Sequence, residues 1–424
     1  MATAWKKSRS RSAESVDPRH ILFLTDNFPP EVNAPASRTF EHCRAWILCG
    51  YRVTVITCAP NFPQGEPFAG YRNLPWQTEY VEGIRVIRVW SYMAENQGFL
   101  LRVIDHISFM ISAVLASLFV RKVDVIIGTS PQFFTACAAC AAAALKRKPW
   151  VFELRDLWPD AIRAIGAIRS RVLFRCIETI ELFLYRRANL IVAVTHAFRK
   201  DLVRRGISAS KIRVITNGVD LARFRPTTKD PELIRKHALQ GKFTVGYIGT
   251  QGMSHALMTL IDACSLLAKR ADACKIHILM IGDGAEKRVL KREAECRHLK
   301  NVSFIDTVPK ADVPRYWALL DLAVVHLKDL PVHRTVIPSK IFESMAMGIP
   351  MLHGVKGESQ DIVQKAGAGI IFEQENPADL AEKIVELSRS SDAMRAMSVN
   401  GRAAAPQYDR NVLAQEMLTE IAQL

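Results

Sequence analysis

The sequence predicts an α/β protein with two doubly wound domains that face a central cleft. Its 424 residues are too many for one ordinary domain. Short apolar runs alternate with amphipathic helical segments in both halves, which is the rhythm of parallel sheets covered by helices. A polar, turn-rich stretch at 225–231 separates the halves. We therefore expect ligands where the carboxyl ends of the strands face the cleft.

Changes in composition give the expected domain boundaries. Residues 1–17 are polar and basic and lack the apolar stretch of a secretory signal, so they are predicted to be a disordered arm. The first domain is expected at 18–225, a linker at 226–240 and the second domain at 241–405. The final segment, 406–424, is predicted to be a helix that crosses back to the first domain.

The overall charge suggests an acidic partner. Lys and Arg number 57 against 42 Asp and Glu, which gives a formal net charge of +15. Anionic lipid and phosphorylated substrates fit such a balance, whereas no zinc framework or aromatic RNA-binding signature supports nucleic acid. The nine cysteines are scattered and odd in number, which favours a reducing compartment. Cys137 and Cys140 have redox spacing, but in an Ala-rich run they are predicted to be small core residues.

The first half contains short runs with the composition of strands. The first two are joined by a predicted helix, 36–49, which Gly50 closes, and together they form a βαβ unit. Loops rich in Pro follow both strands, at the edge where parallel sheets bind ligands. In chain order the predicted strands are 20–25, 52–57, 84–89, 123–128, 150–153, 190–194 and 212–215.

Two helical segments of the first half have unusual surfaces. Within 99–120, the stretch 107–120 is apolar or small for fourteen residues, which is short of the roughly 20 needed to span a bilayer. We expect a buried or interfacial helix there. Segment 169–187 mixes arginines with apolar and aromatic residues. That pattern suits a helix on an anionic membrane and equally an ordinary amphipathic helix against the sheet.

The second half repeats the alternation of strands and helices. Glycine-containing loops follow its first two predicted strands, and helices are expected from Pro377 and from about Asn411. In chain order the predicted strands are 243–248, 276–281, 302–305, 322–327 and 350–353.

The stretch 334–350 has the features of a ligand-binding helix. Pro338 and Ser339 predict its start, and we expect the Ser339 side chain to satisfy a backbone N–H there. Free N–H groups beside Lys340, with Glu343 one turn above, would suit an anion that carries sugar hydroxyls. The alternative is a capped core helix with a Lys/Glu pair.

Seven short stretches carry loops and helix starts in a fixed order along the chain. They are NFPPE (27–31), APNFPQG (59–65), ELRDLWPD (153–160), ITNGVD (215–220), GYIGTQGMSHAL (246–257), IGDG (281–284) and PSKIFESMAMGIP (338–350). From residue 20 to the end, their order and spacing resemble the retaining GT-B glycosyltransferases of the glycosyltransferase 4 group. The resemblance is greatest to bacterial surface-polysaccharide transferases of the N-acetylfucosamine type.

This resemblance implies two Rossmann-like domains, with the donor, a nucleotide sugar with uridine as the base, in the second. Glu343 would bind the ribose hydroxyls, and the helix start at Ser339 and Lys340 would face the diphosphate. Glycines in the first loop would let the backbone approach the phosphates. The predicted donor-binding residues are Gly249, Gly252, Ser254, His255, Lys328, Arg334, Ser339, Lys340 and Glu343.

Two positions depart from the pattern of the group. Thr335 lies eight residues before Glu343, where a second Glu is usual, and Arg155 stands where many relatives carry His. Arg155, Asp156 and Lys340 are the predicted catalytic residues; alternatively, Arg155 and Asp156 form a buried pair that braces a loop. The resemblance implies retention at the anomeric carbon without a bound metal or cofactor, and no Asp-x-Asp motif occurs in a suitable loop.

The first domain would then bind the acceptor. The predicted acceptor-binding residues are Pro30, Glu31, Arg38, Asn61 and Trp158. The apolar and basic helical segments favour a lipid-linked saccharide acceptor and an anionic membrane surface, which places the protein peripherally on the cytoplasmic inner face of the cell membrane. The expected role is biosynthesis of surface polysaccharides such as O-antigen. The alternatives are a nucleotide-sugar 2-epimerase of the same fold and a non-catalytic binding protein.

Overall fold

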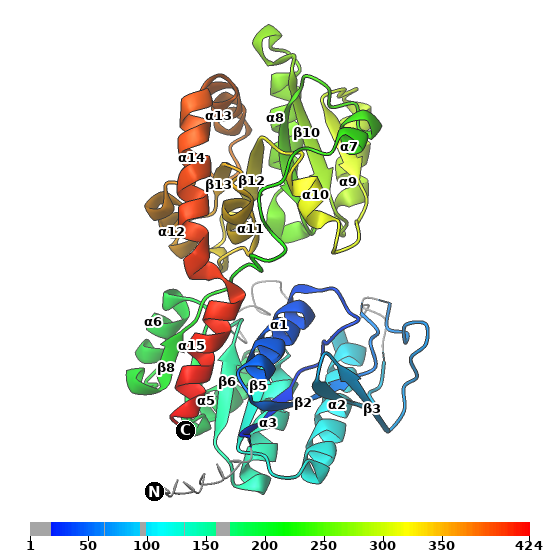
Figure 1. The fold of residues 1–424 in the computed structure, drawn as a ribbon, viewed down its shortest axis with the longest axis vertical. Helices are drawn as coiled ribbons and strands as arrows, with labels where there is room; N and C mark the ends of the chain where they lie inside the picture. Colours follow the sequence, from blue (N-terminus) through cyan, green and yellow to red (C-terminus); the bar gives the residue numbers. More distant parts are fainter. Residues whose placement is uncertain (1–17, 63, 94–98, 131, 158–169) are drawn as a thin grey trace, which may run out of the picture.

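The structure is a computed structural model that describes residues 18–62, 64–93, 99–130, 132–157 and 170–424. Two α/β units lie one above the other, each with a central sheet covered by helices (Figure 1). The predicted fold class is therefore confirmed.

The first sheet has eight strands in the order β3-β4-β2-β1-β5-β6-β7-β8. All its pairs are parallel except β3 with β4, an antiparallel hairpin at the edge. β3 was not predicted from the sequence, because its residues alternate between exposed and half-buried and carry little apolar signal. The strands are β1 (His20–Leu24), β2 (Arg52–Cys58), β3 (Trp76–Val81), β4 (Ile84–Val89), β5 (Val125–Thr129), β6 (Trp150–Leu154), β7 (Leu190–Ala193) and β8 (Ile212–Val214).

Helices cover both faces of this sheet, because its strands are apolar on both sides. In β1, Ile21 and Phe23 pack toward α1 and α15, whereas Leu22 and Leu24 pack toward α2, α3 and α5. Free Cys137 and Cys140 lie on α3 and pack at the margin of that core. The helices are α1 (Ala34–Leu48), α2 (Phe99–Phe119), α3 (Phe133–Lys146), α5 (Arg171–Arg187), α6 (His196–Arg204) and α15 (Arg410–Ala422), with the short η1 (Ala209–Lys211).

Helix α2 packs on α3 and leaves much of its surface uncovered. It is longer than the apolar run in the sequence, and its segment Leu101–Phe119 is long and apolar enough to cross a membrane by length and composition. Only 22% of that segment is buried inside the protein. Apolar side chains exposed along it are Leu101, Ile104, Ile111, Leu115, Leu118 and Phe119.

The second sheet has six parallel strands in the order β11-β10-β9-β12-β13-β14. Helices α8, α9 and α13 cover one face, and α10, α11 and α12 cover the other. The strands are β9 (Phe243–Ile248), β10 (Ile276–Ile281), β11 (Val302–Ile305), β12 (Leu322–His326), β13 (Met351–Gly354) and β14 (Gly369–Ile371). The α-helices are α7 (Pro231–Lys236), α8 (Met258–Leu267), α9 (Lys287–Cys296), α10 (Val313–Trp317), α11 (Lys340–Met347), α12 (Glu358–Ala366), α13 (Pro377–Arg389) and α14 (Ser391–Ala404); the short 3-10 helices are η2 (Met253–His255), η3 (Ala271–Ala273), η4 (Pro331–Thr335) and η5 (Ala405–Tyr408).

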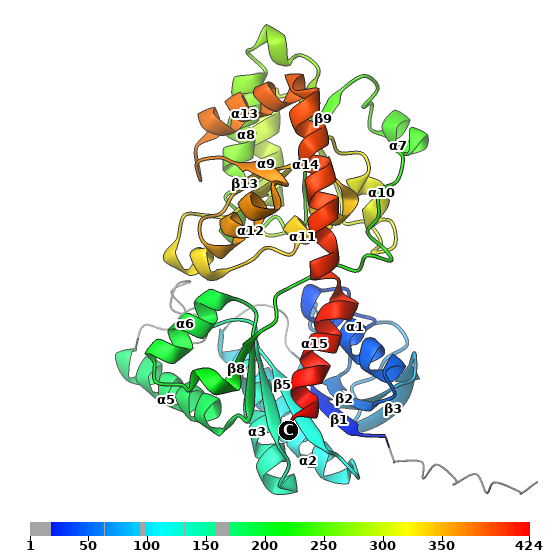
Figure 2. The same ribbon diagram turned by 60° about the vertical axis from the view of Figure 1, so that its left-hand side comes forward.

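The chain crosses between the domains twice, and the two crossings run side by side (Figure 2). The Val219 N–H donates to the Tyr408 carbonyl at 2.9 Å, and the Arg410 N–H donates to the Val219 carbonyl at 3.0 Å. Val219 already belongs to the core of the second domain, and so does Leu233 of α7. The first crossing therefore lies before the predicted linker at 226–240, which contains a packed helix.

The last helix completes the first domain. α15 lies against α1, and the Trp46 indole N–H donates to the Ala414 carbonyl at 2.8 Å. Leu413, Met417 and Ile421 are buried in the same core as β1 and β2. The C-terminal segment is therefore part of the first domain in space.

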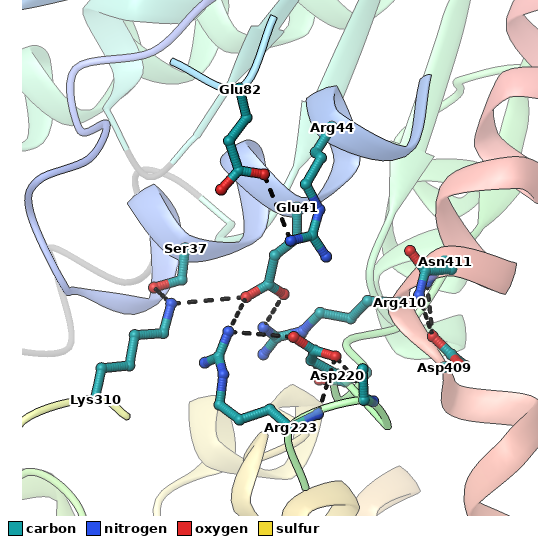
Figure 3. Close-up of polar contacts among 12 residues, drawn as sticks. Ser37, Glu41, Arg44, Glu82, Asp220, Arg223, Lys310, Asp409, Arg410 and Asn411 are labelled. Carbon is teal, nitrogen blue, oxygen red and sulfur yellow. Dashed lines mark hydrogen bonds and ion pairs between the residues drawn. The ribbon is translucent and has the colours of Figure 1, made fainter. Parts of the chain in front are cut away.

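A buried carboxylate joins α1 to both crossings and to the second domain (Figure 3). Glu41 of α1 is 5% exposed, pairs with Arg410, and lies 3.2 Å from Arg223 Nη2 and 3.6 Å from Lys310 Nζ. Burial would raise the pKa of Glu41, but these three cations outweigh it and lower the pKa. We call Glu41, Arg223, Lys310 and Arg410 the interdomain cluster.

Candidate active site

Lys340 stands at the start of α11 with its ammonium group inside the second domain. Its Nζ lies 3.8 Å from the ring centroid of Tyr247, at the end of β9, in a cation–π contact. His255 packs edge-on against the same ring, with centroids 6.0 Å apart. Within the part of the chain that the structure describes, Lys340 Nζ has no hydrogen-bond partner.

This environment makes the charge on Lys340 costly. Burial lowers the pKa of Lys340 to about 7, although Glu343 acts in the opposite direction. Burial also lowers the pKa of His255 to about 4, so this imidazole is neutral at pH 7. An amine held without a partner in this way is well suited to an anionic ligand.

Glycines let two loops meet beside this amine. A Cβ on Gly249, which has φ +136°, would lie 3.0 Å from Lys340 Nζ. A Cβ on Gly282 would lie 2.2 Å from the Gly249 carbonyl oxygen, which excludes any side chain there. The GTQG and IGDG stretches of the sequence are thus two turns packed against each other, with Gly252 beside His255.

The start of α11 exposes backbone donors, but its first residue does not cap it. Ser339 makes no side-chain capping hydrogen bond, so that expectation is wrong. The N–H groups of the residues 341–343 bond to the carbonyls of Pro338 and Ser339. Among the described residues, this leaves the N–H groups of Ser339 and Lys340 without hydrogen bonds, as an anion site requires.

Glu343 lies one turn further along α11. Its Oε2 accepts a hydrogen bond of 3.1 Å from the indole N–H of Trp317, a buried residue of α10. Burial raises the pKa of Glu343, against the effect of Arg410, Trp317 and Lys340. Its Oε1 makes no hydrogen bond to any described residue and can accept one from a ligand.

Arg155 and Asp156 follow β6 at the cleft. Both backbone N–H groups bond to Ser130 Oγ, at 2.7 Å and 3.3 Å. Arg155 Nη2 donates to Asn217 Oδ1 at 2.9 Å, while Nη1 is buried and has no partner among the described residues. No ion pair between Arg155 and Asp156 is present in this part of the structure, which argues against a bracing pair.

A cavity of about 160 Å³ lies between the domains at this point. The first domain contributes Arg155 and Asp156 to its lining, and the second contributes Thr335 together with Val336 and Ile337. The two positions that depart from the expected pattern, 155 and 335, thus line one cavity. Its remaining lining residues are Pro35, Val194, Phe198 and Asn217.

Three other predicted donor-binding residues have contacts that do not include Lys340. Arg334 has a side chain that is 54% exposed and pairs with Asp329 at 3.2 Å. Ser254 is exposed and lies in η2, whereas the next α-helix begins only at Met258. The backbone N–H of Lys328 donates a hydrogen bond of 2.9 Å to the Ser254 carbonyl.

The predicted acceptor-binding residues mostly brace loops. Glu31 Oε1 accepts hydrogen bonds from the N–H groups of Asn61 at 2.9 Å and Phe62 at 3.0 Å, which ties the two Pro-rich loops together. Arg38 is 6% exposed and pairs with the buried Glu153. Pro30 is exposed on its loop, and Trp158 lies outside the described residues.

Sequence reasoning missed several residues of the site. Trp317 contacts Glu343 from α10 and stands in none of the seven stretches, whereas Tyr247 contacts Lys340 and could have been found in the GYIGTQGMSHAL stretch. Asn217 could have been found, because it lies in the ITNGVD stretch; its Nδ2 also donates to the Ile337 carbonyl at 3.4 Å.

Two family models match the chain and together span most of it. One, described as a glycosyl transferase 4-like domain, matches residues 33–218. The other, described as glycosyl transferases group 1, matches residues 242–390. The matches coincide with the two α/β units of the structure.

Similar proteins span nearly the same length. The chain is 24% identical over 339 residues to "Putative colanic acid biosynthesis glycosyl transferase WcaI" of Escherichia coli, which covers 77% of this chain and 81% of that protein. It is 23% identical over 391 residues to a GDP-mannose-dependent alpha-mannosyltransferase of Mycolicibacterium smegmatis, covering 88% of this chain and 91% of the relative. The crystal structure of Anabaena HepE in complex with UDP-glucose matches with a TM-score of 0.69 at 18% identity, over 96% of this chain and all of that one.

Proposed function

The chain belongs to the glycosyltransferases with the GT-B fold, and from this premise we propose that it moves a sugar from a UDP-sugar to a lipid-linked saccharide during surface-polysaccharide biosynthesis. The observation that carries the proposal is the buried Lys340 ammonium, which has no partner among the described residues and lies one turn from Glu343. A nucleoside diphosphate supplies both of the groups that are missing there, an anion and a pair of ribose hydroxyls.

In this proposal the second domain holds the donor. The diphosphate lies against the free N–H groups of α11 and Lys340, and Glu343 accepts hydrogen bonds from the ribose. Uridine is supported by the solved HepE structure, which contains UDP-glucose. The resemblance of the sequence motifs favours an N-acetylfucosamine-like sugar.

The proposed reaction retains the configuration at the anomeric carbon. The bond from this carbon to the diphosphate breaks, and a bond to the acceptor oxygen forms on the same face of the sugar. The leaving diphosphate takes the proton of the acceptor hydroxyl. Lys340 and the helix start stabilise the charge that develops on the leaving group, a form of stabilisation worth about 10²-fold or more in rate.

The first domain would bind the acceptor at the inner face of the cytoplasmic membrane. The exposed apolar side of α2 supports this placement. α5 covers the same face of the sheet and exposes Phe183 and Ile180, with Arg186 and Arg187 in its last turn. Apolar and basic groups on one side suit an anionic lipid surface.

The test is a thermal-shift measurement with UDP and UDP-glucose on the wild-type protein and on Glu343→Ala. A ligand at a hundred times its dissociation constant stabilises the folded state by about 2.7 kcal/mol, so the wild type should shift clearly. The substitution removes the ribose acceptor and should reduce or abolish the shift. Glu382→Ala, at an exposed position on α13, is the matched control and should shift like the wild type. No shift of the wild type with any nucleotide would refute the proposal.

A further inference from the structure

A carboxylate of the second domain binds the start of a helix in the first domain. Glu358 is the first residue of α12; its Oε1 accepts a hydrogen bond of 3.0 Å from the His196 N–H, and its Oε2 accepts one of 3.1 Å from the Ala197 N–H. These are the first two N–H groups of α6. The third, that of Phe198, donates to the Thr195 Oγ1 of the same helix start at 3.0 Å. The cap of α6 is therefore shared between the two domains.

The same carboxylate stands at the start of its own helix. α12 has no side-chain capping hydrogen bond, and Glu358 belongs to its first turn. Each helix N-terminus carries a partial positive charge of roughly half an elementary charge, so the starts of α6 and α12 would repel each other if no anion lay between them. Hydrogen bonds to a charged acceptor are also stronger than those between neutral groups. One side chain thus joins two positive helix ends that belong to different domains.

This contact lies on the side of the cleft away from the interdomain cluster. In Figures 1 and 2, α6 lies below α12 on one side of the two crossings, and α1 lies on the other side. On the α1 side, Lys310 of the second domain donates a hydrogen bond of 2.6 Å to Ser37 Oγ. The domains are therefore joined on both sides of the crossings, and loss of the Glu358 contact would free the α6 side.

Both ends of the Glu358 contact lead into the interdomain cavity. In the first domain, Phe198 of α6 lines this cavity. In the second domain, Gly357 packs on η4, because a Cβ there would lie 2.1 Å from the Arg334 carbonyl oxygen. From η4 the chain continues through 335–337, which line the opposite wall, to the start of α11 at Lys340. Moving the start of α12 away from α6 would therefore separate the two walls.

We propose that Glu358 is a positioning residue, which keeps the start of α11 at the distance from the first domain that sugar transfer requires. This inference rests on the proposed function, because a donor bound at Lys340 reacts only if it meets the acceptor held by the first domain. Both carboxylate oxygens of Glu358 are engaged by α6, so the residue acts through the placement of the domains. It should affect the reaction step rather than the binding of the nucleotide.

Hydrogen exchange by mass spectrometry and small-angle X-ray scattering test the contact on the full chain without ligand. In Glu358→Ala, the peptide that contains His196 and Ala197 should exchange at least about tenfold faster than in the wild type, and the radius of gyration should increase. Glu358→Gln keeps one acceptor oxygen and should lie between the two. Asp361→Asn is the matched control, because it removes a charge from the same first turn of α12 and leaves the contact in place.

Ligand affinity and turnover separate positioning of the domains from a local loss of stability. Titration calorimetry should give the same affinity for UDP, within about twofold, in all four proteins, because the second domain alone holds the nucleotide. The release of UDP from UDP-glucose should fall at least about tenfold in kcat in Glu358→Ala, with an unchanged KM for UDP-glucose. Glu358→Gln should again lie between the wild type and Glu358→Ala.

Four other results would overturn the inference. Unchanged exchange or an unchanged radius of gyration in Glu358→Ala would show that the contact does not hold the domains, whether or not UDP-glucose is turned over. An equal loss of rate in Asp361→Asn would assign the effect to the stability of α12, and a loss of UDP affinity in Glu358→Ala would place Glu358 in the donor site. In these cases UDP still binds the wild type, so the proposed function survives; failure of UDP to bind the wild type would refute both.

Discussion

Lys340 is a titrating group in the physiological range, because burial brings its pKa down to about 7 from 10.5. Between pH 7 and 10.5 the unfolded chain binds more protons at this position than the folded protein, so folding stability rises with pH across this window. Folding favours the neutral form of the Lys340 amine, whereas an anionic ligand favours its charged form. Ligand binding above pH 7 should therefore take up a proton.

We expect the affinity for UDP to fall as the pH rises from 7 to 9, with a slope that approaches tenfold per pH unit. The nearby His255 stays neutral in this range, since its pKa is about 4. Titration calorimetry at pH 7, 8 and 9 measures the slope. Lys340→Arg is the control, because its guanidinium does not titrate there. If the affinity of Lys340→Arg for UDP also falls with rising pH, a group other than Lys340 causes the pH dependence.

Site residues that lie on one predicted helix could be placed near one another from the sequence alone. Ser339, Lys340 and Glu343 lie on one helix, so their common face follows from sequence alone. The contacts that set their environment, from Tyr247 and Trp317, depend on how α11 packs against β9 and α10. Glu31 and Arg38 were assigned to the acceptor by their place in the first domain, yet in the structure their side chains bond to partners within that domain.

At the scale of elements, α2 has an apolar surface that no described part of the chain covers. Its outward residues recur at helical spacing, so they form a stripe rather than scattered points. Single exposed apolar residues also occur elsewhere, such as Val399 on α14. The stripe on α2 is the feature that supports the proposed contact of the first domain with a membrane.

The double substitution Ile111→Ser and Leu115→Ser should weaken binding to vesicles that contain anionic lipid. Both side chains are more than half exposed, at 52% and 56%, so the substitutions should leave the core intact. Cosedimentation with liposomes measures the loss, which we expect to be several-fold because each removes apolar area from the lipid contact. Val399→Ser, at 50% exposure in the second domain, is the matched control. Equal retention of all three proteins would contradict the assignment of this face.

Element types followed from the sequence better than element boundaries. Strands such as β1, β5 and β10 are buried on both faces, so continuous apolar runs mark them. The edge strand β3 lacks this mark and was missed. The polar composition of 226–240 predicted a linker. In the structure this stretch contains the short helix α7, which packs on the second domain through one buried side chain, Leu233, and so carries little apolar sequence.

At the scale of the whole molecule, the interdomain cluster fixes how the two units are joined. Glu41 is the only one of its four members with a negative charge, and three cations surround it. Its pKa is lowered, so the stability that it contributes is present above its unfolded value of 4.5 and is lost as the pH falls through the lower folded value.

Glu41→Ala should destabilise the protein by about 3–5 kcal/mol at pH 7, since it removes the carboxylate from Arg410 and Lys310, while Arg223 keeps Asp220 at 3.2 Å. Urea denaturation with two probes, one in each domain, measures the loss and shows whether the domains separate. Glu382→Ala breaks an exposed pair with Arg270 and should cost at most about 1 kcal/mol. Similar losses for the two variants would mean that the cluster is no stronger than a surface ion pair.

Because α15 packs in the first domain, that domain cannot complete its folding early in synthesis of the chain. Domains usually fold as they are synthesised, the N-terminal one first. Here a wall of the first core includes Leu413, Met417 and Ile421, which are synthesised after the second domain. During translation the apolar side of α1 therefore stays uncovered while the entire second domain is made. The first domain can therefore complete its core only after the second domain has been synthesised.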